Sequence, residues 1–377
     1  MSDREQRIKE DLDALSGVPG RYAGTEGERA MLHAVHERVP QPDLAAIEPF
    51  VTHVSPAAWN GVHAAGLLCA GALGYWAPGV GAVACGLFTA SLVGEGTGRF
   101  RLLRAWAPRT PSYNLTARLD AINPIGTVIV TAPLDVPRWR PQSRRWRRLR
   151  PMRVQVGAAS LVTALLALRL LAEPWGKPSI GMYLVGLAVL AGSMLVGLLT
   201  HRATGAYEDA SGPAALLELQ RRLSEHPVPG LAVWLTWTAS GRAFQGGMEA
   251  FLALHQPSLV EPALVVALDD PGRAPLYAVT SEGHLWQEPH RPTGPAMVER
   301  LRWAGRRIRV TDRSGLTDAG MALRHGLRGL ALTGGEGEAT AHDVDRAVDE
   351  LERILRMFGD DLARIERPAP DEDVASA

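Results

Sequence analysis

The stretch GAYEDASGPAALLEL, residues 205–219, contains the start of a helix that follows a tight turn. Asp209 and Ser211 are of the residue types that cap helix N-termini, and Pro213 stands where a first helical turn tolerates a missing N–H. Three leucines then recur on one helical face: Leu216, Leu219 and Leu223. The pattern predicts a helix over residues 212–223 that packs this face on a core.

Outward from this helix, apolar runs of strand length alternate with further helical patterns. The predicted strands are AAIEPFVTH (45–53), SYNLTARLD (112–120), GTVIVTAPLD (126–135), LAVWLTWTA (231–239) and PALVVALDD (262–270). The further predicted helices are GGMEAFLALH (246–255) and HDVDRAVDELERILRMF (342–358). This alternation predicts an α/β sandwich with a mixed sheet.

Composition narrows the classes of function only slightly. The 377 residues include 40 Lys+Arg and 40 Asp+Glu, so no overall charge favours nucleic acid as a partner. Only two cysteines are present, which excludes a disulfide framework and a zinc site built from cysteines. Any electrostatic function must therefore come from local clusters of charge.

Two long apolar blocks interrupt the soluble pattern. We interpret residues 57–96 and 154–200 as two transmembrane helical hairpins, because their arms approach the length that spans a bilayer and are apolar on nearly every face. The alternative is a pair of buried core hairpins. In the transmembrane interpretation, residues 1–56, 97–153 and 201–366 together form one soluble domain, followed by a disordered tail at 367–377.

The charges beside these blocks predict an orientation. The basic run from Arg138 to Arg153 leads into the second block, so the positive-inside rule places the soluble domain and both termini in the cytoplasm, with four transmembrane helices. The N-terminus has no apolar region typical of a signal peptide. Because the run adjoins a membrane segment, we expect anionic lipid headgroups as its partner rather than nucleic acid.

Several motifs in order resemble the M28 zinc peptidases, a family of aminopeptidases, carboxypeptidases and glutaminyl cyclases. The matching segments are LSGVPGRYAGTEGERAMLHAVHERV, YNLTARL, GTVIVTAPLD, GAYEDASGPAALLEL, AVWLTWTASGRAFQGGMEAFL, VVALDDPG and TDRSGLTDAGM. The resemblance implies a zinc-exopeptidase fold with a two-metal site at the carboxyl ends of the central strands. In such a site, metal-bound water attacks the peptide and a glutamate takes its proton.

The family's site is degenerate in the first half of this chain. Where the family carries a metal-binding histidine, this sequence has Pro133, which offers no ligand atom, while the nearby acid remains as Asp135. Glu208 falls at the position of the aspartate that bridges the two metals.

The second half is degenerate too. Ser240 and Gly241 match the paired glutamates, one of which is the general base, and Arg313 matches the late histidine. Asp269 keeps an acid at a ligand position. We therefore expect a membrane-embedded, catalytically inactive pseudopeptidase that acts as a binding or scaffolding module, with no cofactor and with a protein or peptide as partner.

The alternative is an active metallo-exopeptidase with a rebuilt, reduced site. Zinc would then be held by Asp135, Glu208 and Asp269, and further groups would come from Asp209 and from His201 or His325.

Two further expectations concern the site. Loss of zinc would leave carboxylates close together, so we predict that Arg313 points its guanidinium at Asp269 or Glu208. Because the second apolar block separates two site-bearing segments, we also predict that it holds the mouth of the old site near the bilayer or the basic run.

Overall fold

The computed structural model describes most of the chain. Its described ranges are 2–53, 56–97, 100, 102–104, 109–136, 151–171, 188, 191–192, 210–241, 244–283, 285–286, 288–290, 299–300, 308–313, 315–335 and 337–366. The basic run, except for its last residues, and the predicted disordered tail lie outside these ranges.

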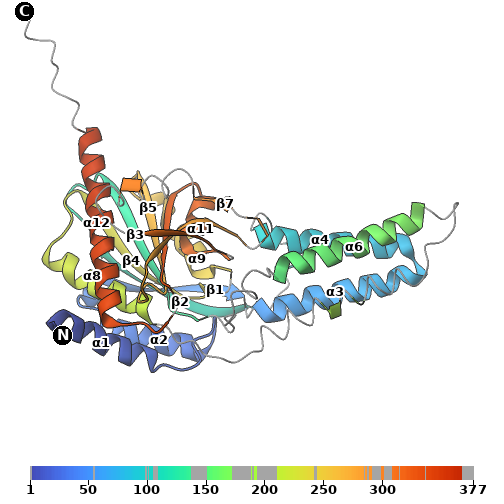
Figure 1. The fold of residues 1–377 in the computed structure, drawn as a ribbon, viewed down its shortest axis with the longest axis horizontal. Coiled ribbons are helices and arrows are strands. Elements are labelled where there is room, and N and C mark those ends of the chain that lie inside the picture. Colours follow the sequence, from blue (N-terminus) through green and yellow to red (C-terminus); the bar gives the residue numbers. More distant parts are fainter. Residues whose placement is uncertain are drawn as a thin grey trace, which may run out of the picture.

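A nine-stranded mixed sheet forms the centre of the α/β domain (Figure 1). Its order is β1-β2-β4-β3-β5-β9-β6-β7, and β8 pairs with β6. Strands β4, β3, β5 and β9 run parallel, whereas β1–β2, β2–β4 and β6–β9 pair antiparallel. The strands are β1 (Ala45–His53), β2 (Arg109–Leu119), β3 (Gly126–Pro133), β4 (Leu231–Thr238), β5 (Ala263–Asp269), β6 (Tyr277–Glu282), β7 (Glu288–Pro289), β8 (Arg309–Arg313) and β9 (Arg328–Thr333).

Helices cover both faces of the sheet. Successive strand residues point to opposite faces, so Val128 and Val130 pack toward α8 and α12 while Ile129 packs toward α9 and α11. The central parallel strands are therefore apolar on both faces, as buried parallel sheets require. One layer contains α1 (Asp3–Ser16), α2 (Glu26–His36), α8 (Ser211–Glu225) and α12 (Ala341–Glu366), and the other contains α9 (Gly246–His255) and α11 (Asp318–Arg324). Two short 3-10 turns, η1 (Pro42–Leu44) and η3 (Gln256–Ser258), complete the domain.

The predicted strands and helices are confirmed, with small changes at their ends. Strand β1 and helix α9 have the predicted bounds, and α12 continues to Glu366. The predicted cap at Ser211 is wrong, since Ala210 is the N-cap, and the other predicted cap, Asp209, lies outside the described residues. The Ser211 hydroxyl instead accepts a hydrogen bond from the Gly272 N–H at 3.1 Å, which ties the helix to the loop after β5.

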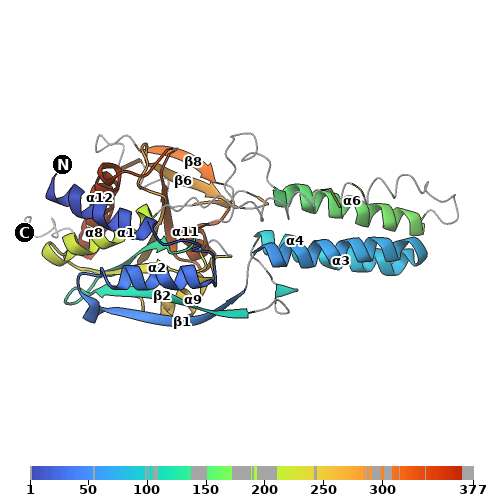
Figure 2. The same ribbon diagram turned by 90° about the horizontal axis from the view of Figure 1, so that it is seen from below.

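Three further helices project from the domain as a separate bundle, here called the helical extension (Figures 1 and 2). It consists of α3 (Pro56–Trp76), α4 (Pro78–Thr97) and α6 (Pro151–Leu171). Small residues let α3 and α4 approach closely: a Cβ on Gly81 would lie 2.3 Å from the Gly74 Cα. Inside the bundle, Leu67, Leu92 and Leu166 form a core of their own.

The structure does not support the prediction of two transmembrane hairpins with four spans. Within the described ranges, only α4 is long and apolar enough to cross a membrane. The described side chains of α3 and α6 add two shorter apolar stretches, Val62–Trp76 and Arg153–Leu168. Most of the predicted second arm of block two, 172–200, lies outside the described residues.

The two parts of the helical extension, α3–α4 and α6, connect to the sheet on the same side, at the carboxyl ends of its central strands. Helices α3 and α4 connect the end of β1 to the start of β2, where His53 pairs with Arg109. Because β2 is antiparallel to β4 and β4 is parallel to β3, the start of β2 lies at the carboxyl edge of the central strands. Helix α6 follows the carboxyl end of β3, so the helical extension is attached beside this edge.

Candidate functional site

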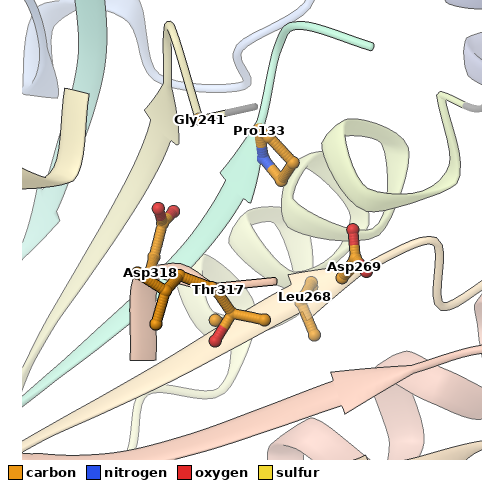
Figure 3. Close-up of a pocket in the computed structure, with 8 residues that line it drawn as sticks. Pro133, Gly241, Leu268, Asp269, Thr317 and Asp318 are labelled. Carbon is orange, nitrogen blue, oxygen red and sulfur yellow. The ribbon is translucent and has the colours of Figure 1, made fainter. Parts of the chain in front are cut away.

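A pocket opens at the carboxyl edge of the central strands (Figure 3). It encloses about 260 Å³ of empty space, part of which is open to solvent. The ends of β3 and β5, the turn after β4 and the start of α11 form its walls. The lining residues are Pro133, Gly241, Ala267, Leu268, Asp269, Leu316, Thr317 and Asp318. Of the positions singled out in the sequence, this pocket brings together Pro133, Gly241 and Asp269.

Asp269 and Arg313 form an ion pair beside this pocket. Asp269 is the last residue of β5 and is buried, whereas Arg313 ends β8 and keeps 21% of its side chain exposed. The prediction that Arg313 turns its guanidinium toward Asp269 is therefore confirmed. A planar guanidinium cannot lose its proton in a protein, so it compensates the buried carboxylate at any physiological pH.

Pro133, Asp135 and Gly241 meet on one side of the pocket. Pro133 ends β3, and the buried Asp135 follows two residues later. The Asp135 Oδ1 accepts a hydrogen bond from the Gly241 N–H at 2.7 Å. A Cβ on Gly241 would lie 2.9 Å from the Pro133 Cβ and 3.2 Å from Asp135 Oδ1. This close approach leaves no room for a glutamate side chain without movement of the neighbouring strand.

Ser240 is held from the other side by Glu28, a residue that the sequence did not single out. The Ser240 N–H donates to Glu28 Oε1 at 2.6 Å, and Glu28 Oε2 accepts from the Ser112 hydroxyl at 2.8 Å and from the Gly24 N–H at 2.9 Å. Ser240 itself has φ 52°, an uncommon left-handed conformation for a residue other than glycine.

Burial raises the pKa of the Glu28 carboxyl, although the hydrogen bonds from Ser240, Gly24 and Ser112 oppose that shift. Glu28 therefore fixes the backbone of the turn after β4 instead of presenting a carboxylate to the pocket. No local motif marks this role, because the chain brings Glu28 and Ser240 together only through the fold.

A second buried acid, Asp318, lines the pocket at the start of α11. It approaches from α11 while Asp269 comes from β5 (Figure 3). Asp318 Oδ2 accepts a hydrogen bond from the Thr238 hydroxyl at 2.8 Å. Thr317 caps the same helix by accepting from the Gly320 N–H, and its own N–H donates to the buried Glu282 at 3.1 Å. Asp318 was not predicted, although it lies in the TDAGM segment that resembles the family.

The other predicted positions lie elsewhere. Glu208, Asp209 and His201 belong to the range 201–209, which is outside the described residues. His325 is exposed at the C-terminal end of α11, while Thr317 and Asp318 line the pocket at the opposite end of that helix. The structure therefore does not bring His325 to the pocket.

Among the described residues, the donor atoms around the pocket do not form a zinc site. Asp269 is engaged by a guanidinium, Pro133 has no ligand atom, and the Asp135 carboxylate accepts the Gly241 N–H. Across the described part of the chain, no three side chains of His, Cys, Asp or Glu converge closely enough to hold a metal ion. Zinc requires about four such ligands, and sites of this kind usually include histidine. The two carboxylates that line the pocket are already engaged, Asp269 by Arg313 and Asp318 by the Thr238 hydroxyl.

Comparison with known proteins defines the fold. No protein-family model matches the sequence, and no curated protein does. Among solved structures, the zinc aminopeptidase BSAP from Bacillus subtilis superposes with a TM-score of 0.51 at 10% identity, and the match covers 94% of each chain. An Acidobacteriales bacterium glutaminyl cyclase (TM-score 0.48, 11% identity, 95% and 94% coverage) and an aminopeptidase from Aneurinibacillus sp. strain AM-1 (0.48, 12%, 97% and 94%) are also similar. At such identities the likeness concerns the fold alone, and this chain has a mixed α/β fold like that of a zinc aminopeptidase.

Proposed function

We propose that this protein is a membrane-embedded, catalytically inactive pseudopeptidase whose α/β domain serves as a binding or scaffolding module. The observation that carries this proposal is the Asp269–Arg313 ion pair at the carboxyl edge of the sheet. In a working two-zinc site, an acid at this position would coordinate metal, and the late histidine would be a ligand.

The ion pair supplies one thing that a bound metal would supply, a positive charge that compensates the buried Asp269 carboxylate. A buried carboxylate costs free energy unless a positive charge or hydrogen bonds compensate it. Arg313 supplies that charge permanently, and its guanidinium leaves no vacant coordination position for water. The arrangement therefore preserves the fold around the pocket without a Lewis acid or a metal-activated nucleophile.

The membrane part of the proposal rests on the outer surface of the helical extension. Large apolar side chains stand exposed on all three helices, with Trp76 at 77%, Val83 at 67% and Leu87 at 61%. The others are Val62, Leu73, Tyr75, Val80, Val154, Leu161 and Leu168. Monomeric soluble proteins rarely expose apolar surface on this scale. An apolar medium around the extension would cover it.

A membrane-embedded extension implies two kinds of partner, lipids and a protein or peptide. The bilayer surrounds the helical extension, and the arginines between Arg138 and Arg153, which follow the carboxyl edge of β3 along the chain, bind anionic lipid headgroups. The pocket and its surroundings then receive a protein or peptide close to the membrane surface. On this proposal the α/β domain and both termini lie on the cytoplasmic side, which the arginines beside the extension favour by the positive-inside rule.

Metal content and hydrolysis test the proposal together. We would purify the full chain in detergent after growth with added zinc, and measure zinc per protein and hydrolysis of aminoacyl-anilide substrates. We expect far less than one zinc per chain, no hydrolysis above background, and no change on Asp269→Asn. Near-stoichiometric zinc that Asp269→Asn removes, accompanied by hydrolysis, would overturn the proposal.

One observation favours the alternative of an active exopeptidase with a reduced site. Asp269 and Asp318 line one pocket and Asp135 borders it, so three acids lie together at the carboxyl edge of the central strands. Glu208 would have to join them as a metal ligand. In this case the same assay would show hydrolysis that depends on zinc and on Asp318.

A further inference from the structure

We propose that the helical extension controls the shape of the pocket through a relay of three side chains, Glu95, Arg104 and Phe244. This inference goes beyond the proposed function, because it concerns how the extension acts on the pocket and does not require the pocket to be catalytic or inactive.

The first contact of the relay lies at the base of the extension. Glu95, near the end of α4, forms a buried ion pair with Arg104, which lies on the segment that returns toward β2. Gly94 permits this return, since a Cβ there would lie 2.4 Å from the Phe100 ring. The charge of Glu95 therefore fixes the position of the Arg104 guanidinium.

The second contact crosses into the α/β domain. The Arg104 guanidinium stacks over the Phe244 ring, with 3.9 Å between the guanidinium carbon and the ring centroid. A buried cation held over an aromatic face is attracted by the ring, and more strongly when water is excluded. Phe244 is thereby held by a residue whose own position depends on α4.

The third step carries the contact to both walls of the pocket. Phe244 precedes Gln245, and both have positive φ values, 65° and 52°. The Gln245 Nε2 donates to the Gly241 carbonyl at 2.9 Å and to the Leu316 carbonyl at 2.7 Å. Gly241, in the turn after β4, and Leu316, in the loop before α11, line the pocket from two different segments. A shift of Phe244 therefore moves both walls.

The backbone of the turn after β4 is strained, so the conformation of this turn depends on the contacts that hold it. Ser240, Phe244 and Gln245 are three of the five residues other than glycine with positive φ among the described residues. Such conformations persist only where surrounding contacts impose them, so removing one contact releases the turn more readily than it would an unstrained loop. Three amide hydrogens report the state of the turn, because those of Ser240, Gly241 and Gly246 are all hydrogen-bonded.

Hydrogen exchange of the full chain in detergent, followed by mass spectrometry, tests the relay. We expect Glu95→Gln, which keeps the shape of the side chain, to accelerate exchange of the amides at 239–246 by up to about thirtyfold, the factor that full loss of a desolvated cation–π contact would produce. Phe244→Leu keeps an apolar side chain but removes the aromatic ring that the guanidinium contacts, so it should have the same effect. The double variant should exchange no faster than Phe244→Leu alone, because both changes break one pathway.

Ser91→Ala is the matched control. Ser91 lies one turn before Glu95 on α4, and its hydroxyl is 3.0 Å from the His63 Nε2, so this change perturbs the interior of the extension without touching the relay. Exchange at 239–246 should remain as in the native chain. Unchanged exchange in both Glu95→Gln and Phe244→Leu, or equal acceleration in Ser91→Ala, would overturn the proposal. Zinc and substrate play no part in the measurement, so the proposed function can fail independently.

Discussion

The α/β domain and the helical extension place apolar side chains in opposite locations. In the domain, Leu235 and Trp237 are fully buried between helices and sheet. In the extension, Val83 and Leu87 point outward, whereas the polar pair His63 and Ser91 is buried between helices. The domain therefore buries its apolar side chains, whereas the extension exposes many of them and pairs polar groups in its interior, the distribution expected if an apolar medium surrounds it, as we propose.

The α/β domain and the helical extension thus place apolar side chains in opposite ways within one chain, and short connections join the two regions. Two ion pairs lie near these connections: Glu95–Arg104 on the side of the extension, and Asp269–Arg313 at the carboxyl edge of the sheet. Four predictions test the contrast, from the outer surface of the extension through the core to this edge.

The largest effect is expected from charge on the outer face of α4. Val83→Arg combined with Leu87→Arg places two arginines one helical turn apart on the exposed face, at a cost of about 2.5 to 3.5 kcal/mol each if that face contacts hydrocarbon. The fraction of protein that stays in alkali-washed membranes should fall sharply. Ile122→Arg, at a residue 94% exposed in the α/β domain, is the control and should leave that fraction unchanged. Equal retention of both proteins would show that the extension is not embedded.

The next effect concerns the core of the domain. Trp237 is fully buried, and its indole N–H donates to the Pro213 carbonyl at 3.2 Å. Trp237→Ala should lower the free energy of unfolding by about 3 to 5 kcal/mol, because it leaves a cavity and an unpaired carbonyl. Denaturant titration of the detergent-solubilised protein measures this change. Trp286→Ala, at a tryptophan that is 58% exposed, should cost much less, and similar losses would contradict the assignment of the core.

A smaller effect is expected at the carboxyl edge. Arg313→Ala leaves Asp269 buried without its cation, and because Arg313 is partly exposed we expect a loss of about 1 to 3 kcal/mol, below that of a fully buried pair. Thermal unfolding at neutral pH provides the measurement. The exposed pair of Arg300 and Asp361 is the control, and Arg300→Ala should cost about 0 to 1 kcal/mol. A loss of that same size for Arg313 would mean that water already compensates Asp269.

The smallest expected effect is a change in how the free energy of unfolding varies with pH. The pKa of Glu28 in the folded protein lies above its ordinary value of 4.5, so the folded state keeps this proton to higher pH than the unfolded state does. Its contribution to stability is therefore complete below pH 4.5 and is lost as the pH rises through the raised pKa, by at most about 1.4 kcal/mol per pH unit. Glu28→Gln should remove this part of the slope. An identical pH profile for both proteins would contradict the shift.

The central part of the fold could be predicted because its strands carry their own signal. Strand β3 and strand β5 are continuous apolar runs of strand length, and both were located within a few residues. Strand β8 was not assigned, since RVTDR is short, polar and largely exposed. Its place in the sheet depends on pairing with β6 rather than on local pattern.

The candidate site shows the same division. The Asp269–Arg313 pair was predicted because a buried acid at a strand end requires a compensating charge, and the aligned motif supplied an arginine. Glu28 and Asp318 were missed, because Glu28 reaches Ser240 and Ser112 only after helix α2 packs on the sheet. The prediction of two membrane hairpins is not supported, since α4 alone among the described helices is long and apolar enough to cross a membrane.

The position of α3 and α4 between β1 and β2 also bears on the order of folding. These two strands are sheet neighbours, yet their closest register pair, His53 and Arg109, is separated by the whole helical hairpin. Closing so long a loop costs chain entropy before any strand contact repays it. If α3 and α4 pack first, their antiparallel arrangement brings the two strand ends together and removes most of that cost. The α3–α4 pair would then nucleate the edge of the sheet, so that a defect between α3 and α4 would slow the pairing of β1 with β2 even in a domain whose own core is intact.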